Sequence, residues 1–195
     1  MPVMLWHMTH LWATLSGGDD FDKAVLDLFI VAFWGLARLA ELTYSSRTGE
    51  IAFAESVLST DVFFTTCERG EAVTLTVRNA KTGAPGAPQI ITLGEQRHAL
   101  CPVLAIRRRI SATEGKHTYL FGSNTVDGRQ HVTRREAVTR LGEVLSLGDY
   151  HGLRGHSFRV GGASLRAALG MSAGDLSQKR TLLRTLRGNW KKMDL

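Results

Sequence analysis

A long apolar stretch between residues 21 and 44 constrains the fold more than any other feature of this sequence. Its large apolar side chains recur at intervals of three and four residues, which places them on one face of an α-helix. The members of this stripe are Val25, Leu28, Phe29, Ala32, Phe33, Leu36 and Leu39. Asp19 and Asp20 precede the stretch, and negative charge is favourable at a helix start. We therefore predict one long, largely buried helix around which the other elements must pack.

The chain has 195 residues, which suits a single domain with its own core. Hydrophobic residues make up 44% and charged residues 22%, so extensive disorder is excluded. The apolar run over residues 28–37 is about half the length that a bilayer-spanning helix needs. The first residues lack the basic start and the cleavage site of a secretory signal. Cys67 and Cys101 are too few for a disulfide framework, so a reducing compartment is expected.

Beyond residue 49 the apolar period changes from that of a helix to that of strands. Residues 61–66, 73–79 and 89–93 are rich in β-branched and aromatic residues, and turn-forming residues occupy 81–86. Further helices are predicted from residue 101 or 102 to 110, from a capping box at Thr133 to about 145, over 155–169, and from 172 towards 187. The predicted fold class is α+β: a single, mostly helical domain with one small antiparallel sheet.

Charge is distributed unevenly along the sequence. Residues 1–96 hold 6 basic and 11 acidic side chains, a net charge of −5, whereas residues 97–195 hold 18 basic and 7 acidic side chains, a net charge of +11. A basic half of this kind indicates a polyanionic partner, with nucleic acid the leading candidate. An ordinary solvated basic surface is the alternative.

Two pairs of polar residues stand out at helical spacing. Arg38 and Glu41 interrupt the apolar stretch and are three residues apart, so they would share a helix face as an ion pair or as part of an anion site. His156 and Arg159 have the same spacing near the predicted start of a helix, where free amides and the dipole favour a phosphate. The alternative for the second pair is a surface histidine and arginine on a tightly packed helix. Gly155, Gly161 and Gly162 would let another backbone or a DNA strand approach closely.

These features, in this order, resemble the catalytic domain of tyrosine recombinases, the phage-integrase-like enzymes that break and rejoin DNA. The resemblance covers nearly the whole chain, from about residue 2 to residue 192, and consists of R-x-x-E, a hairpin lysine, H-x-x-R and a late tryptophan. The segments FWGLARLAELTY and HSFRVGGAS are most similar to fungal-transposon-like members. The resemblance implies a DNA-binding catalytic domain acting on double-stranded DNA, in the nucleus if the source is eukaryotic and in the cytoplasm otherwise.

The resemblance also implies how the phosphate is held. Arg38 and Arg159 would grip its non-bridging oxygens with two guanidinium forks, which suit the negative charge that develops during attack. Glu41 would order its neighbours without touching the phosphate.

Proton transfer would involve the remaining residues of the set. Lys81, in the predicted hairpin turn, is similar to the lysine that protonates the leaving 5′-oxygen, and His156 would act beside it. Trp190 occupies the position that members of this family fill with histidine or tryptophan, although taken alone it would be a core or edge tryptophan. No metal or other cofactor is implied, and His7 with His10 is an isolated pair.

The sequence departs from the family pattern at the nucleophile. The family uses a tyrosine shortly after the Trp190 position, but residues 191–195 contain none, and Tyr44, Tyr119 and Tyr150 all precede the H-x-x-R motif. We therefore expect a chain that lacks both the nucleophile segment and the N-terminal DNA-clamping domain.

This departure leaves several functions open. The chain could belong to an active enzyme, could receive its nucleophile from a partner subunit, or could be a non-catalytic DNA-binding remnant of a mobile element. Type IB topoisomerases resemble the same set of residues, but the crowded segment around H-x-x-R favours recombinases. Whether subunits assemble on DNA is also left open.

Overall fold

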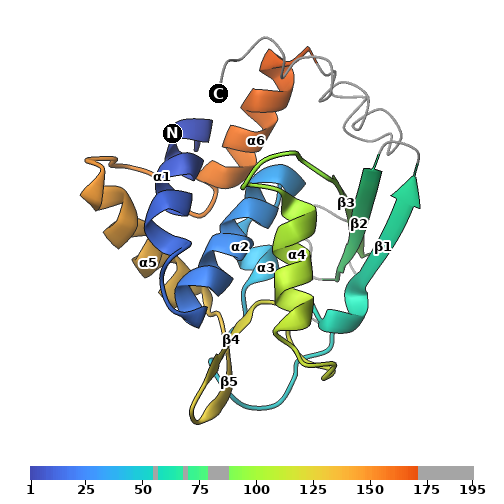
Figure 1. The fold of residues 1–195 in the computed structure, drawn as a ribbon. Helices are drawn as coiled ribbons and strands as arrows, with labels where there is room; N and C mark the ends of the chain where they lie inside the picture. Colours follow the sequence, from blue (N-terminus) through green and yellow to red (C-terminus); the bar gives the residue numbers. More distant parts are fainter. Residues whose placement is uncertain (55–56, 68–69, 79–87, 171–195) are drawn as a thin grey trace.

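The computed structural model of the chain describes residues 1–54, 57–67, 70–78 and 88–170. The helices are α1 (Leu5–Leu15), α2 (Asp20–Gly35), α3 (Leu39–Leu42), α4 (Pro102–Ser111), α5 (Arg134–Leu147) and α6 (Ser157–Ala168), with a 3₁₀ turn at Ser59–Asp61. The strands are β1 (Val62–Cys67), β2 (Gly70–Val77), β3 (Gln89–Gly94), β4 (Gly122–Thr125) and β5 (Gly128–His131). Helices and a small antiparallel sheet form one unit (Figure 1), which confirms the predicted α+β class.

Helix α2 lies at the centre of the domain and contacts α1, α4 and α6 (Figure 1). It begins at the N-cap Asp19, whose carboxylate accepts the backbone N–H of Asp22 at 2.8 Å. Every residue from Ala24 to Trp34 is buried. None of the described helices is long and apolar enough to cross a membrane. The apolar stripe of α2 is thus satisfied by packing within the domain.

The prediction of one helix over residues 21–44 is wrong in its second half. Helix α2 ends at Gly35, and Leu36 adopts a left-handed conformation with φ 52° and ψ 32°. A separate short helix, α3, follows. Leu39 and Leu42 of α3 pack into the same core as α2, so apolar residues continue to recur at helical spacing across the break. The sequence pattern therefore gave no sign of the turn.

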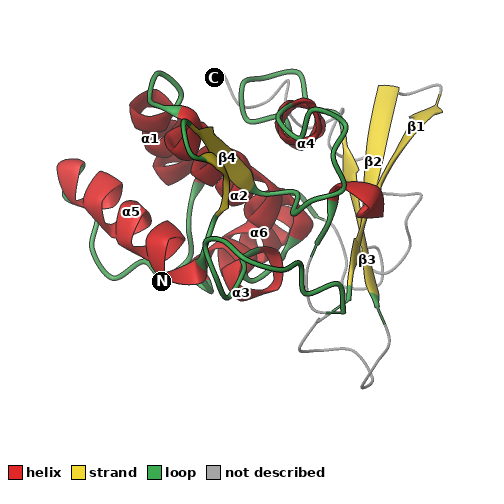
Figure 2. Ribbon diagram, turned by 90° about the horizontal axis from the view of Figure 1, so that it is seen from below, coloured by secondary structure: helices red, strands yellow, loops and turns green. Residues whose placement is uncertain are grey.

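The three-stranded sheet lies to one side of the helices (Figure 2). Its strand order is β1-β2-β3 with antiparallel pairing, and Leu75 of β2 lies opposite Val62 of β1 and Ile91 of β3. The alternating residues Val73, Leu75 and Val77 are buried, as expected for a sheet with one covered face. Strands β4 and β5 form a second hairpin that our sequence analysis did not predict.

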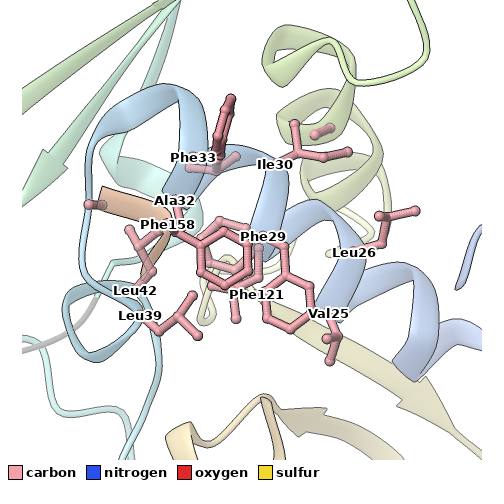
Figure 3. Packing of buried hydrophobic residues seen from close by; sticks show 14 of the residues in the cluster. Val25, Leu26, Phe29, Ile30, Ala32, Phe33, Leu39, Leu42, Phe121 and Phe158 are labelled. Carbon is pink, nitrogen blue, oxygen red and sulfur yellow. The ribbon is translucent and has the colours of Figure 1, made fainter. Parts of the chain in front are cut away.

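Aromatic and leucine side chains join α2, α3 and α6 into one core (Figure 3). The rings of Phe29 and Phe158 stack with centroids 4.9 Å apart. Leu39, Leu42 and Phe121 lie around this pair, and all five side chains are buried. Burial of each such side chain stabilises a fold by roughly 1.5–3 kcal/mol. This core fixes α6 against the middle of α2 and against α3.

Candidate anion-binding site

Arg38 and Glu41 form a compact unit at the turn between α2 and α3. Arg38 is the N-cap residue of α3 and Glu41 is its third helical residue. One carboxylate oxygen of Glu41 accepts the backbone N–H of Arg38 at 2.9 Å, and the other accepts Nη1 of Arg38 at 2.9 Å. The Glu41 side chain is only 4% exposed, against 26% for Arg38. The carboxylate therefore fixes the arginine, while Nε and Nη2 of Arg38 have no hydrogen bond among the described residues.

His156 and Arg159 lie at the start of α6, as predicted. His156 is the N-cap residue and is exposed, and Arg159 is half-buried in the first turn. Nη1 of Arg159 is buried and has no hydrogen-bond partner in the described part of the chain. Leaving a buried donor unsatisfied costs about 1–3 kcal/mol, and more for a charged group. Nη1 of Arg159 thus has unused hydrogen-bonding capacity, which an anion admitted to this position would fill.

Two close contacts bring the start of α6 against the α2–α3 turn. At Gly155 an added Cβ would lie 3.3 Å from Cβ of Leu39. At Gly162 an added Cβ would lie 2.6 Å from Cδ2 of Leu36 and would overlap the carbonyl oxygen of Phe33. Of the two uses that the sequence left open for the glycine pair, the structure shows approach of another backbone.

The contacts of Gly155 and Gly162 lie on either side of Arg38 and Arg159 in the sequence. Arg159 lies between Gly155 and Gly162 on one segment, and Arg38 lies between the residues that these glycines touch on the other. The two segments therefore run alongside each other although the arginines are 121 positions apart in the sequence. The roles assigned to Arg38, Glu41, His156 and Arg159 stay predictions.

Lys81 and Trp190 lie outside the described residues, so the structure gives no position for either. Sequence reasoning also missed Arg166, which lies on α6 seven residues after Arg159 and is buried. A signal existed, because a charged residue on the apolar face of a helix requires a partner.

Tyr44 and Tyr119 are buried in the core of the domain. The hydroxyl of Tyr44 donates to the carbonyl of Val57 at 2.7 Å and accepts the N–H of Phe121 at 3.1 Å. Burial raises the pKa of Tyr44, which opposes formation of a phenolate. The Tyr119 ring stacks on Tyr44 with centroids 4.0 Å apart.

Tyr150 precedes α6 in the sequence, and its ring packs edge-on against the ring of His7 in α1, with centroids 4.6 Å apart. The hydroxyl of Tyr119 accepts the N–H of Ala52 at 2.8 Å. The hydroxyls of Tyr44 and Tyr119 are therefore hydrogen-bonded to backbone groups, and the ring of Tyr150 packs against α1.

An open hollow of about 520 Å³ is lined by Asp20, Arg108, Arg109 and Asn124, among others. Its arginines are committed to Asp27, with Nε of Arg108 at 3.0 Å and Nε of Arg109 at 2.8 Å from that carboxylate. A hollow whose cations are already neutralised is a weaker anion site than the α6 start.

The fold is similar to solved structures of FLP-type recombinases on DNA. A Flpe–Holliday junction complex matches with a TM-score of 0.56 at 12% identity, over 94% of this chain and 45% of that chain. A mutant Flpe–DNA Holliday junction complex gives 0.56 at 12% identity, over 91% and 41%. FLP recombinase–Holliday junction complex I gives 0.55 at 14% identity, over 97% and 43%. The chain thus spans less than half the length of these proteins.

At this level of identity the likeness is one of fold, and it confirms the expected tyrosine-recombinase catalytic fold. No known protein family and no curated protein matches the sequence.

Proposed function

We propose that this chain is the phosphate-binding catalytic domain of a tyrosine recombinase that breaks and rejoins double-stranded DNA. The observation that carries the proposal is the buried Nη1 of Arg159, which has no partner among the described residues and lies on a segment packed alongside Arg38. The similarity in fold to recombinases solved on Holliday junctions supports it. We further propose that the chain is of the fungal-transposon-like type within this family, because the sequence segments around Arg38 and Arg159 resemble that type.

The proposed site stabilises charge on a phosphodiester under attack. Negative charge grows on the non-bridging oxygens as the phosphorus gains a fifth ligand, and preorganised cations lower the energy of that state. Arg159 would offer its unsatisfied Nη1, and Arg38 would offer Nε and Nη2 while Glu41 holds its other donor. Guanidinium forks keep their charge at every working pH. His156, exposed at the N-cap of α6, would exchange protons with the reacting oxygens, together with Lys81.

The proposed reaction also needs a tyrosine hydroxyl, which would come from a segment outside these 195 residues or from a partner subunit. The commitment of Tyr44 and Tyr119 to the core supports this, and it equally favours a second candidate function: DNA binding without strand cleavage.

Binding of a nicked duplex that carries a 3′-phosphate tests the phosphate site. Arg159→Ala should weaken binding at least tenfold, because both the charge and the fork are lost. Arg159→Lys should recover only part of the loss, since lysine cannot bind bidentately. Arg97→Ala is the matched control: it removes one exposed charge that has no ion pair in the described part of the chain. Equal losses for Arg159→Ala and Arg97→Ala would mean that binding is unspecific charge attraction, and the proposal would fail.

A further inference from the structure

The end of α2 is held by a residue of α6. Nη2 of Arg166 donates to the carbonyl oxygen of Trp34, in the last turn of α2. The chain then turns through the left-handed Leu36, and the N–H of Ala37 returns to the carbonyl of Ala32 at 3.0 Å. Carbonyls at a helix end need partners from outside the helix, and Arg166 supplies one.

Leu36 is a branched residue in a conformation that favours glycine. Residues of this kind persist there only where their surroundings hold them. Gly162 covers Leu36 directly, and Arg166 lies one helical turn further along α6. Two residues of α6 therefore hold the turn from which Arg38 emerges.

Burial of the Arg166 guanidinium carries a desolvation penalty. Arg166 is buried, it has no acidic partner among the described residues, and burial lowers its pKa to about 10. The negative end of the α2 dipole and the Trp34 carbonyl are the compensating partners that the structure offers. A methionine would fill the same volume without that cost, which indicates that the hydrogen bond itself is used.

We propose that Arg166 is a positioning residue, which fixes the α2–α3 turn and thereby the place of Arg38 relative to Arg159. Arg159, Gly162 and Arg166 are spaced i, i+3 and i+7, so they lie on one face of α6. This face carries Arg159 and also holds the turn that positions Arg38. The assignment of Arg38 to the phosphate rests on the proposed function, whereas the hold on the turn does not.

Amide hydrogen exchange tests the hold on the turn. In Arg166→Met the amides of Ala37 and Arg38 should exchange at least tenfold faster, because the turn loses its external partner, while the amide of Val31 inside α2 should keep its rate. Arg166→Lys, which retains a charged donor, should restore part of the protection and serves if the methionine variant does not fold. Unchanged exchange at Ala37 and Arg38 in both variants would overturn the inference.

A double-mutant cycle on binding of the nicked 3′-phosphate duplex tests the link to Arg38. Arg166→Met should weaken binding about as much as Arg38→Ala, and the double variant should bind no more weakly than Arg38→Ala alone, because Arg166 acts through Arg38. Additive losses would overturn the positioning role. Val73→Ala, which shortens a buried side chain of β2, is the control for lost stability and should leave affinity within about twofold.

The two readouts separate the two proposals. If neither Arg38→Ala nor Arg159→Ala changes binding of the duplex, the proposed function fails. The exchange of Ala37 and Arg38 then still decides whether Arg166 holds the turn.

Discussion

At the scale of single residues, burial changes the protonation of histidines in this domain. His131 is buried with its ring edge-on to Tyr119 at 4.1 Å, and burial, with the nearby charge of Arg129, lowers its pKa below 6.5. Burial, with the charge of His10, likewise lowers the pKa of His7. Both rings prefer to remain neutral in the folded state.

These lowered pKa values predict that the domain loses stability on acidification. As pH falls through 6.5 the unfolded chain takes up protons at His131 and His7 before the folded chain does, so the free energy of unfolding decreases. The decrease stops once pH passes the folded pKa values. Urea titrations between pH 7.5 and 5 should show it, and His131→Phe should reduce the slope. Stability that stays constant over this range would contradict the assignment.

Also at the residue scale, local spacing identified both pairs of candidate residues, Arg38 with Glu41 and His156 with Arg159, but only the family resemblance placed the two pairs in one site. The pairing of Arg38 with Glu41 was predictable, since three residues separate them on one helical turn. That Arg38 and Arg159 lie on adjoining segments requires the contacts at Gly155 and Gly162, which only the fold supplies. The sequence marks Arg166 as a residue that needs a partner, but that partner is a backbone carbonyl, which side-chain patterns do not identify.

At the scale of elements, the segments with strong local signals were predicted correctly. Strands β1, β2 and β3 and helices α4, α5 and α6 lie within a few residues of their predicted bounds, and Thr133 caps α5 as expected. Helix α1 was not predicted because it has no charged residue in its first or last turn to mark its ends. The β4–β5 hairpin was missed although Asp127 in its turn is followed by Gly128, the first residue of β5, and this pair is typical of tight turns.

Packing of α6 against α2 predicts opposite effects for the same substitution in two helices. Gly162→Ala should destabilise the domain by about 1–3 kcal/mol, because its Cβ would meet Leu36 and the Phe33 backbone and force α6 away. Gly142→Ala in α5 is the matched control: nothing lies within 4 Å of its Cβ, so better helix propensity should stabilise by about 0.5–1 kcal/mol. Chemical denaturation measures both, and destabilisation of equal size at the two positions would show that close approach is not the cause.

At the scale of the whole molecule, the acidic and basic halves of the sequence interleave in space. Arg108 and Arg109 pair with the buried Asp27, and Arg140 pairs with Asp22, with Nε 2.7 Å from the carboxylate. Part of the positive charge of the second half is thereby neutralised by the first half. Uneven charge along a sequence is thus no measure of a basic surface, and contact with a polyanion depends on the cations that stay unpaired. In the described part these include Arg97, Arg134, Arg135, Arg154 and Arg159.

The supply of the nucleophile is also a property of the whole molecule. Covalent cleavage needs an oxygen in line with the phosphate, and the arginines cannot replace it. Because Tyr44 and Tyr119 are bonded within the core and Tyr150 packs against α1, the 195-residue chain should form no covalent adduct with a nicked duplex that traps 3′-phosphotyrosyl products. Mixing it with an Arg159→Ala chain extended through a downstream tyrosine should restore adduct formation if the nucleophile is donated between subunits, and Tyr→Phe in that extension should abolish it. Mass spectrometry of trypsin digests locates the adduct: a modified Tyr44, Tyr119 or Tyr150 in the unextended chain would refute this account of the nucleophile.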